Sequence, residues 1–352
     1  MSGALPVAVL GGTGYVAGEM LRLIAGHPRF VLAAGSSESR AGQPVADTFP
    51  GLALAMAGEH FCDEAALASS VREGRVRGLF CAAPHGAAAR RIDACIAAAA
   101  AAGQALTVVD ASADFRFRDP AAYEAVYGHP HPVPNRLEEF LCAVPEHLAG
   151  TPAAHAAHPG CFVTSVLLAI VPLLKAGVAE PEFFVSSVTG STGAGRTLRE
   201  TTHHPERHAN MFAYQPLVHR HRPEIEALAA EAAGACAVRF VPHSGPWTRG
   251  IHTTVQGRLA PGASPGDVAV ALAAAYETAT FVEVCPGPPR LKDVTGSNRA
   301  RLAAASDGEG FVVTCVLDNL VKGAAGGALQ WMNRLLGLPD DCGLRAPGPA
   351  WT

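Results

Sequence analysis

The chain has 352 residues, of which 49% are hydrophobic and 16% are charged, and its formal net charge at pH 7 is -4. This much apolar material supports a large core and excludes an intrinsically disordered chain, and the length favours two domains. The small negative charge, without a dense basic patch, argues against nucleic acid or an anionic membrane as the main partner.

The N-terminus and the longest apolar runs lack the patterns of targeting and membrane segments. No basic region precedes the short apolar run at the start, so we expect no secretory signal peptide. The apolar stretches 92–102 and 162–174 fall short of the roughly 20 residues that a membrane-spanning helix needs. We therefore expect a soluble cytoplasmic protein, and its nine widely spaced cysteines are interpreted as reduced thiols.

The first part of the chain alternates strands and helices. We expect strands at 7–10, 30–34, 76–83 and 106–110, and helices at 15–25 and 87–103. A glycine turn separates the first strand from the first helix, and Gly26 and Pro28 end that helix. This order predicts a doubly wound parallel sheet, a Rossmann domain, over residues 1–157.

The pattern changes after Pro159. We expect helices at 162–175, 224–233, 265–278 and 324–336, and strands at 183–188, 237–241, 250–259, 281–284 and 311–317. These runs predict a domain of the α+β type over 158–323, with a mixed, largely antiparallel sheet. The remainder, 324–352, is expected to be a helix that packs back on the first domain, followed by a tail. The fold class is thus α/β with an added α+β domain.

A dinucleotide fingerprint occupies the first glycine turn. Residues 12–17 fit the pattern G-x-G-x-x-A between a strand and a helix, which is the context that the fingerprint requires. Glycines let the backbone approach a pyrophosphate at the helix N-terminus. The candidate residues are Gly12, Thr13, Gly14, Tyr15 and Val16. An ordinary glycine-rich turn is the alternative.

The end of the second strand bears on the choice of cofactor. Sites for NAD usually place an acidic residue there to bind the ribose 2′-hydroxyl. Here the strand runs into Ser36, Ser37 and Arg40, which suit the 2′-phosphate of NADP better. Glu38 argues for NAD if its carboxylate points inward, so the sequence favours NADP(H) without excluding NAD.

Cys161 is the candidate nucleophile. Pro159 and Gly160 break the chain just before an apolar helix, which places Cys161 at the helix N-terminus. Free backbone N–H groups and the helix dipole stabilise a thiolate there, and a thiolate is the nucleophile that acyl transfer needs. The other eight cysteines are interpreted as small core residues.

Histidines and arginines supply candidate partners. His219 and His221 alternate in an extended segment and can face one ligand, as acid and base for the cysteine. We expect no metal there, since no nearby Cys or Asp completes a tetrahedral set. Three arginines beside turns are candidates for binding anionic substrate groups: Arg116, Arg196 and Arg249. Four further histidines are expected in polar surface loops: His129, His131, His203 and His204.

Six segments, in order along nearly the whole chain, resemble the N-acetyl-γ-glutamyl-phosphate reductase family. They are residues 84–86 (PHG), 112–116 (SADFR), 158–161 (HPGC), 191–196 (STGAGR), 219–225 (HRHRPEI) and 318–326 (DNLVKGAAG). The resemblance implies a Rossmann domain followed by a domain like those of glyceraldehyde-3-phosphate and aspartate-semialdehyde dehydrogenases. It implies NADPH-dependent reduction of an acyl phosphate in arginine biosynthesis by a homo-oligomer, a dimer or tetramer.

The resemblance also implies roles for individual residues. Cys161 would be the nucleophile, with His221 or His219 as acid and base. The glycine turn would hold the pyrophosphate, and further cofactor contacts would come from Ser36, Ser37, Arg40, Pro84, Gly193 and Asn319. Substrate contacts would come from Arg116, Arg196, Glu224 and Arg249.

Two departures keep a second substrate open. The family often has Tyr-Pro-Thr after the cysteine, where this chain has residues 162–164 as FVT. Residues 203–207 (HHPER) resemble a sister group that reduces phosphorylated α-aminoadipate or glutamate on a small acidic carrier protein, in lysine biosynthesis. A nucleotide-binding regulator without catalysis is a third, remote reading, which the cysteine and both histidines disfavour.

Overall fold

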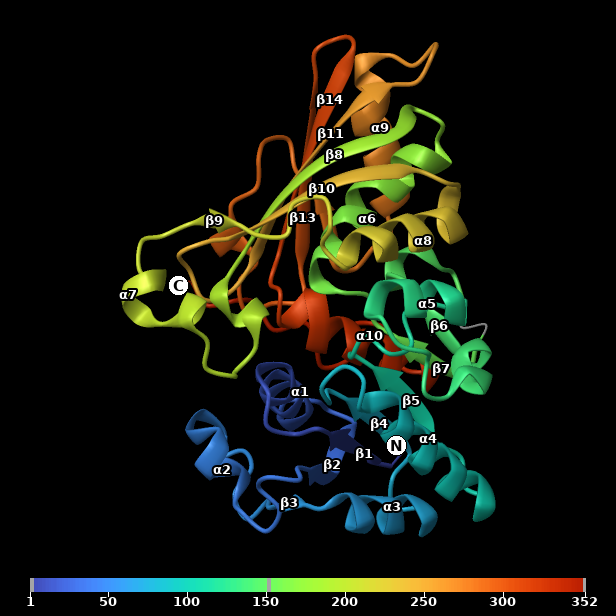
Figure 1. The fold of residues 1–352 in the computed structure, drawn as a ribbon, viewed down its shortest axis with the longest axis vertical. Coiled ribbons are helices and arrows are strands. Elements are labelled where there is room, and N and C mark those ends of the chain that lie inside the picture. Colours follow the sequence, from blue (N-terminus) through green and yellow to red (C-terminus); the bar gives the residue numbers. More distant parts are fainter. Residues whose placement is uncertain (1–2, 151–152, 351–352) are drawn as a thin grey trace. The chain divides into compact units, whose positions relative to one another are not determined.

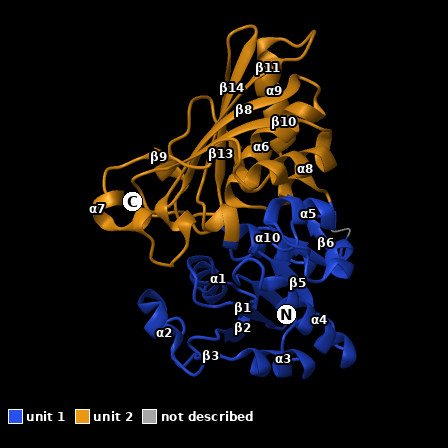
Figure 2. Ribbon diagram, viewed as in Figure 1, with its two compact units in different colours: residues 1–143, 150–158, 325–345 blue, residues 144–149, 159–324, 346–352 orange. Residues whose placement is uncertain are grey.

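The structure is a computed structural model that describes residues 3–150 and 153–350 (Figure 1). It divides into two compact units (Figure 2). Unit 1 comprises residues 1–143, 150–158 and 325–345, and unit 2 comprises residues 144–149, 159–324 and 346–352. The chain therefore passes from one unit to the other several times.

Unit 1 contains a seven-stranded parallel sheet in the order β3-β2-β1-β4-β5-β7-β6. Its strands are β1 (Leu5–Leu10), β2 (Phe30–Ser36), β3 (Phe61–Cys62), β4 (Gly78–Cys81), β5 (Thr107–Asp110), β6 (Phe140–Cys142) and β7 (His155–Ala157). The central strand β4 is buried along its whole length because helices cover both faces of such a sheet. The strand order reverses between β1 and β4, where doubly wound sheets bind their ligands.

The helices of unit 1 follow from this topology. They are α1 (Tyr15–Ala25), α2 (Val45–Thr48), α3 (Glu64–Arg72), α4 (Ala88–Ala101), α5 (Pro120–Tyr127) and α10 (Gly326–Leu335). Since crossovers between parallel strands are right-handed, α1 lies on one face of the sheet, and α3 and α4 lie on the other. Helix α10, from the end of the chain, packs against β5, β7 and α1.

Unit 2 contains a mixed seven-stranded sheet in the order β12-β13-β14-β11-β8-β10-β9. Its strands are β8 (Ala179–Thr189), β9 (Phe212–Ala213), β10 (Ala237–Ser244), β11 (Ile251–Leu259), β12 (Val282–Val284), β13 (Ala300–Ser306) and β14 (Gly310–Leu317). The pairs β8–β10 and β12–β13 are parallel and the others antiparallel. The predicted fold class is thereby confirmed.

Three helices cover one face of the unit 2 sheet (Figure 1). They are α6 (Cys161–Lys175), α8 (His221–Ala233) and α9 (Pro265–Tyr276); the short α7 (His204–Arg207) lies in the segment before β9. Helix α6 is buried from Phe162 to Leu173 because α8, α9 and the sheet surround it. It therefore forms the core of this unit.

A buried chain of hydroxyl groups ties the start of α6 to the sheet. The Ser165 hydroxyl donates to the Phe162 carbonyl at 2.8 Å. Thr253 Oγ1 lies 2.6 Å from Ser165 Oγ and 2.7 Å from Ser187 Oγ, which links α6 to β11 and β8. None of the three hydroxyl residues is exposed, so each hydrogen bond replaces contact with water.

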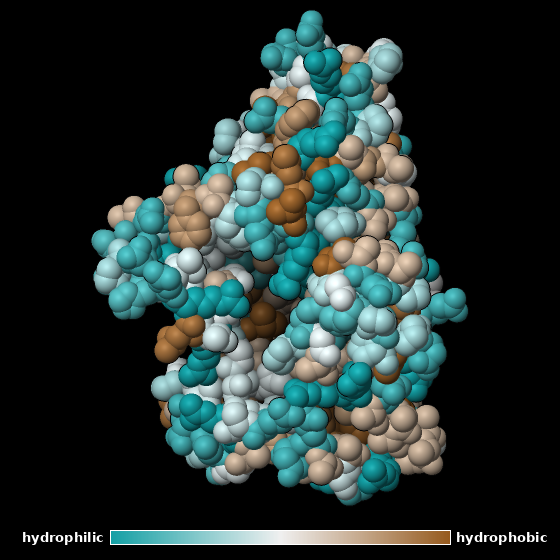
Figure 3. Space-filling model, viewed as in Figure 1, coloured by the Kyte–Doolittle hydropathy of each residue, from teal (hydrophilic) through white to brown (hydrophobic). Residues whose placement is uncertain are grey.

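The face of the unit 2 sheet that these helices leave open carries hydrophobic side chains. Phe184 on β8 is 55% exposed, and Leu217 nearby is 47% exposed. Figure 3 shows hydrophobic surface over the strands of this unit. A shallow hollow of about 330 Å³ there is lined by Phe184, Val185, Ser186, Leu217, Arg239 and Val241.

One predicted surface residue is in the core. His131 was expected in a polar loop but is only 4% exposed, and that expectation is wrong. Its ring packs edge-on against Phe115 and Tyr123, and its Nε2 lies 2.9 Å from the Asp114 carbonyl oxygen. Among the residues that the structure describes, no helix combines the length and the apolar character needed to cross a bilayer.

The hydroxyl chain gives a stability prediction. Thr253→Val keeps the side-chain shape but leaves Ser165 and Ser187 without their shared partner, so we expect a loss of about 1–3 kcal/mol of unfolding free energy. Urea unfolding measures it. Thr254→Val, on the other face of the same strand and partly exposed, is the control. If Thr253→Val and Thr254→Val had the same unfolding free energy, the buried hydroxyl groups would not stabilise the fold as we expect.

Candidate active site

Cys161 is the first residue of helix α6, and Gly160 is its N-cap residue. No described side chain forms a capping hydrogen bond at this helix end, so the first backbone N–H groups of the helix stay available beside Cys161. The Gly160 N–H donates to Glu224 Oε1 at 2.8 Å, and the Gly160 carbonyl accepts from the Thr164 N–H at 2.8 Å. Cys161 is half-buried, and the peptide ahead of it is held on both sides.

A second segment packs directly against the cysteine. A Cβ atom added to Gly323 would lie 2.7 Å from Cys161 Cβ, so only glycine fits there. Gly323 belongs to a π-helical turn, Val321–Ala325. The neighbouring Lys322 is fully buried, and its Nζ donates to Glu146 Oε1 at 2.5 Å. This buried ion pair fixes the turn that supports the cysteine.

Cys161 opens into a pocket of about 480 Å³ within unit 2. Strand ends, the start of α8 and the segment before β9 form its walls. The lining residues are Cys161, Phe162, Thr189, Gly193, Ala194, Arg199, Thr201, Thr202, Phe212, Tyr214, Gln215, His219, Arg220, His221 and Ser244. A thiol, two imidazoles and two guanidinium groups thus share one cavity.

The two histidines of the pocket differ in their surroundings. His219 Nδ1 accepts the backbone N–H of His221 at 3.2 Å, and the two rings lie 4.7 Å apart. Burial, and then the charge of Arg220, lower the pKa of His219 to about 4. His219 is therefore neutral near pH 7 and carries its proton on Nε2, as a hydrogen-bond donor. His221 begins helix α8.

Tyr214 is a pocket residue that the sequence did not single out. Burial, and then the negative charge that Cys161 can carry, raise the pKa of its hydroxyl group. The hydroxyl group stays protonated at neutral pH and is available as a donor. Its ring lies 5.5 Å from that of His219.

The predicted substrate arginines belong to different units. Arg116 lies in unit 1, where it is 9% exposed and its Nη2 donates to the Ala111 carbonyl at 3.3 Å. In unit 2, Arg249 Nη1 is 3.3 Å from Asp318 Oδ2, and Arg196 is exposed. None of these three is among the residues that line the pocket.

Two other arginines occupy the pocket instead. Arg199 and Arg220 are lining residues, and both are exposed. Arg220 lies inside the segment that supplied the two histidines, so its position was foreseeable from the sequence. Nothing in the sequence distinguishes Arg199, because its place depends on how the segment before α7 folds back on β8.

The side chains of Glu224 and Asn319 form hydrogen bonds with backbone groups of unit 2. Glu224 is fully buried, and its carboxylate accepts the Gly160 N–H as described. Asn319 Oδ1 accepts the Gly250 N–H at 2.7 Å, and its Nδ2 donates to Thr192 Oγ1 at 3.0 Å. Asn319 therefore supports the turn that carries Gly193 into the pocket.

The glycine turn of unit 1 fits a dinucleotide pyrophosphate. Gly11 has a left-handed φ of 82° and packs so close to Ala83 that a Cβ atom would lie 2.6 Å from its backbone. A Cβ atom on Gly14 would instead enter open space, beside a helix start that no side chain caps. This space at the N-terminus of α1 is where the fingerprint places phosphates.

The end of β2 presents hydroxyl groups and a guanidinium group. Ser36 and Ser37 are buried, and Arg40 Nη1 donates to Gln43 Oε1 at 3.0 Å. Glu38 is exposed, and its carboxylate accepts a hydrogen bond from Arg91 Nη2 at 2.6 Å. The acidic group that argued for NAD is thus paired with an arginine.

The loop after β4 is fixed by one carboxylate. Asp114 accepts the N–H groups of Gly86 and Ala89, each at 2.9 Å, and pairs with His85 Nδ1 at 2.6 Å. Burial alone would raise the pKa of Asp114, but these partners outweigh it and lower that pKa. The loop that carries Pro84 is therefore rigidly attached to the start of α4.

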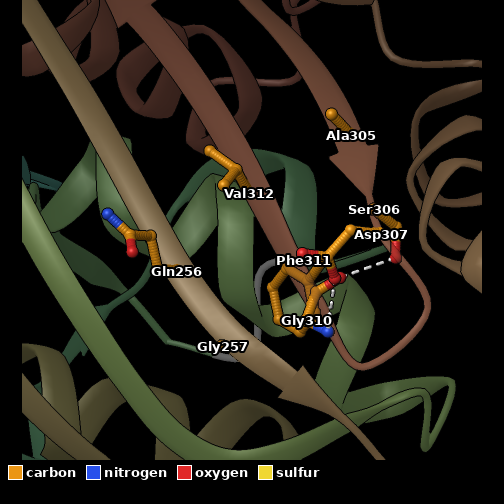
Figure 4. A pocket seen from close by; sticks show the side chains of 8 residues that line it. All are labelled: Gln256, Gly257, Ala305, Ser306, Asp307, Gly310, Phe311 and Val312. Atoms are coloured by element: carbon orange, nitrogen blue, oxygen red, sulfur yellow. Dashed lines mark hydrogen bonds between the residues drawn. The ribbon is translucent and has the colours of Figure 1, made fainter.

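Another hollow of unit 2 lacks such chemistry. It measures about 320 Å³ and lies beside the β13–β14 hairpin (Figure 4). Asp307 Oδ1 accepts the Gly310 N–H at 3.0 Å, and the Ser306 hydroxyl donates to the Gly310 carbonyl at 2.7 Å. These polar groups serve the hairpin turn. Across residues 3–150 and 153–350, no three metal-binding side chains come together in a way that could hold an ion.

Comparison with known proteins identifies the family. A model described as "Semialdehyde dehydrogenase, NAD binding domain" matches residues 6–140, and one described as "Semialdehyde dehydrogenase, dimerisation domain" matches residues 161–319. A protein of Rhodospirillum rubrum named N-acetyl-gamma-glutamyl-phosphate reductase is 38% identical over 98% of both chains. Proteins with that name from Acidithiobacillus ferrooxidans (36%; 96% of both chains) and Azotobacter vinelandii (38%; 97% of this chain, 98% of the other) are similarly close.

Solved structures share the fold at lower identity. Aspartate semialdehyde dehydrogenase II from Vibrio cholerae, complexed with ASA, is 16% identical, with a TM-score of 0.69 over 96% of this chain and 99% of the other. Aspartate semialdehyde dehydrogenase with NADP from Candida albicans is also 16% identical, with a TM-score of 0.63 over 95% and 98%. On the sequence matches, the chain belongs to the N-acetyl-γ-glutamyl-phosphate reductase family of semialdehyde dehydrogenases.

Proposed function

We propose that this chain is a reductase that converts N-acetyl-γ-glutamyl phosphate into N-acetylglutamate semialdehyde and inorganic phosphate, a step of arginine biosynthesis. The observation that carries the proposal is the uncapped start of α6, where Cys161 shares a pocket with two imidazoles and two guanidinium groups. The names of the relatives give the substrate, and the positive charge of the pocket suits a substrate that carries phosphate and carboxylate groups.

Cys161 acts as the nucleophile in this proposal. Its sulfur, as the thiolate, attacks the acyl carbon; the bond to the phosphate oxygen breaks, and a thioester and inorganic phosphate result. The N–H groups at the start of α6 are placed to stabilise the oxyanion that forms in between. After reduction of the thioester, the thiohemiacetal collapses, releases the semialdehyde and regenerates the thiolate.

The histidines move and hold protons in this scheme. His221 or His219 gives a proton to the thioester oxygen during reduction and takes it back when the thiohemiacetal collapses to the semialdehyde and the thiolate. His219 is suited to donate a hydrogen bond from Nε2, because its Nδ1 already accepts the His221 N–H. Glu224 then orients the peptide before the nucleophile through Gly160, in addition to any contact with substrate.

The proposed cofactor is NADP(H), and when bound it supplies the hydride that reduces the thioester. Residues 1–157 would form its domain, and residues 158–323 the catalytic and oligomerisation domain. Gly12, Thr13, Gly14, Tyr15 and Val16 would hold the pyrophosphate. Ser36, Ser37 and Arg40 would face the 2′-phosphate, and the pairing of Glu38 with Arg91 favours NADP over NAD. Pro84, Gly193 and Asn319 would lie toward the nicotinamide, and Arg116, Arg196 and Arg249 toward substrate.

The proposal predicts the behaviour of a nucleophile variant. Cys161→Ser should lose nearly all NADPH oxidation with N-acetyl-γ-glutamyl phosphate, because a neutral hydroxyl group forms no thioester there. Cys315→Ser, at a buried cysteine of the same unit, is the control. NADPH and NADH are compared in the same spectrophotometric assay, and NADPH should give the larger kcat/KM.

The assay also tests the alternative substrate. Acyl phosphate carried on a small acidic carrier protein, the second substrate that the sequence left open, is offered beside the free compound. Turnover of the free compound alone supports our proposal. Turnover only of the carrier-linked compound, or full activity of Cys161→Ser, would overturn it.

The pKa of His219 predicts how stability changes with pH. Its value in the folded protein is about 4, below the ordinary value of 6.5, so the unfolded chain binds a proton first as the pH falls. The free energy of unfolding therefore falls as the pH drops from 6.5 to 4, by up to about 3 kcal/mol, because the folded protein keeps His219 neutral while the unfolded chain protonates it. His219→Gln should show a smaller loss across this range in urea unfolding. His203→Gln, at an exposed position, should behave like wild type; a slope unchanged in His219→Gln would refute the assignment.

We also propose that copies of the chain associate through the open face of the unit 2 sheet. The matching family model is described as a dimerisation domain, and Phe184 and Leu217 expose apolar surface there. Wild type should elute as a dimer or tetramer of the 36.2 kDa chain in light scattering, and Phe184→Asp should shift toward the monomer. Val270→Asp, at an exposed apolar residue of α9 on the other face, should not. A monomeric wild type would disprove the association.

A further inference from the structure

Arg207 carries a buried guanidinium group for which the described residues offer no hydrogen-bond partner. It ends helix α7 and is 8% exposed. Its Nε, Nη1 and Nη2 atoms are all buried, and none has a hydrogen-bond partner within the described part of the chain. Burial lowers the pKa of this guanidinium group. Its main chain, by contrast, is engaged: the N–H donates to the His203 carbonyl at 2.9 Å.

The guanidinium group lies over the ring of Phe212, a residue that lines the Cys161 pocket. Its Cζ is 5.9 Å from the centre of the Phe212 ring, and Phe212 is a lining residue of that pocket. Arg199 and Arg220 line the same cavity. The Phe212 ring therefore contacts the Arg207 guanidinium group and also lines the pocket, so a third cation lies one ring away from the cavity.

Burying the Arg207 guanidinium group without an ion-pair partner is unfavourable, and other arginines of unit 2 show how such groups are usually paired. A buried charge without a hydrogen-bond or ion-pair partner destabilises the folded state, and proteins normally pair it. Other arginines of unit 2 have carboxylate partners: Arg239 Nη2 is 3.1 Å from Glu182, and Arg249 Nη1 is 3.3 Å from Asp318. Within residues 3–150 and 153–350, no carboxylate pairs with Arg207, and its three open nitrogen atoms match the bidentate geometry of phosphate and carboxylate oxygens.

We propose that Arg207 is an anion-binding residue of the Cys161 pocket, which receives an oxyanion group of the substrate once the Phe212 ring turns aside. The inference rests on the proposed function, whose substrate brings both a phosphoryl group and a carboxylate. Either group has the required chemistry, and inorganic phosphate and N-acetylglutamate represent the two separately.

The test uses the full-length protein and Arg207→Met, which keeps the length of the side chain and removes its charge. Because the free protein no longer buries an unpaired cation, Arg207→Met should unfold at a higher Tm than wild type. Phosphate or N-acetylglutamate should raise the Tm of wild type, and Arg207→Met should need at least about tenfold more of that anion for the same shift. Arg299→Gln, at an exposed arginine of unit 2, should match wild type in both respects.

The rate at which Cys161 is alkylated provides a second measurement. The same anion should slow alkylation of Cys161 by iodoacetamide in wild type, and this protection should be lost in Arg207→Met. A lower Tm of Arg207→Met together with an unchanged anion response would overturn the proposal, since it would show a structural arginine. Arg207-dependent anion binding in a protein that reduces no acyl phosphate would support the anion site and refute the reductase function. Reductase activity together with unchanged affinity for both phosphate and N-acetylglutamate in Arg207→Met would refute the anion site and leave the reductase function standing.

Discussion

The hydrogen bond from the Gly160 N–H to the buried Glu224 carboxylate is the constraint on which the site depends. It fixes the peptide just before Cys161, and Thr164 fixes the same residue from inside helix α6. Glu224 belongs to helix α8, whose first residue is His221. One helix therefore positions the backbone of the nucleophile and presents an imidazole group to the same pocket, so a shift of α8 would move both together.

The polarity of the pocket follows from what is buried around it. Desolvation keeps His219 neutral and Tyr214 protonated, so both offer hydrogen-bond donors without adding charge. The positive charge comes from arginines, which remain protonated at any working pH. An anionic substrate would therefore meet fixed donors and cations in a partly desolvated cavity, where such interactions are stronger than in water.

Local patterns explain why much of the fold could be predicted from the sequence. The strand, glycine turn and helix at the start of unit 1, and helix α6 after Pro159 and Gly160, depend on neighbouring residues alone. The short strands β3, β6 and β7 escaped prediction because two or three residues show no periodicity. They are strands only because a neighbouring strand supplies their hydrogen bonds.

The sequence by itself determined the glycine turn and the cysteine at a helix start, since both are properties of contiguous residues. Only the tertiary structure decided that His131 is buried and that Arg199 and Tyr214 line the pocket of Cys161. It also decided that the Arg207 side chain is enclosed with no hydrogen-bond partner among the described residues. Those outcomes depend on which distant segments pack together. Burial and pairing arise from long-range contacts, and no local pattern of residues encodes them.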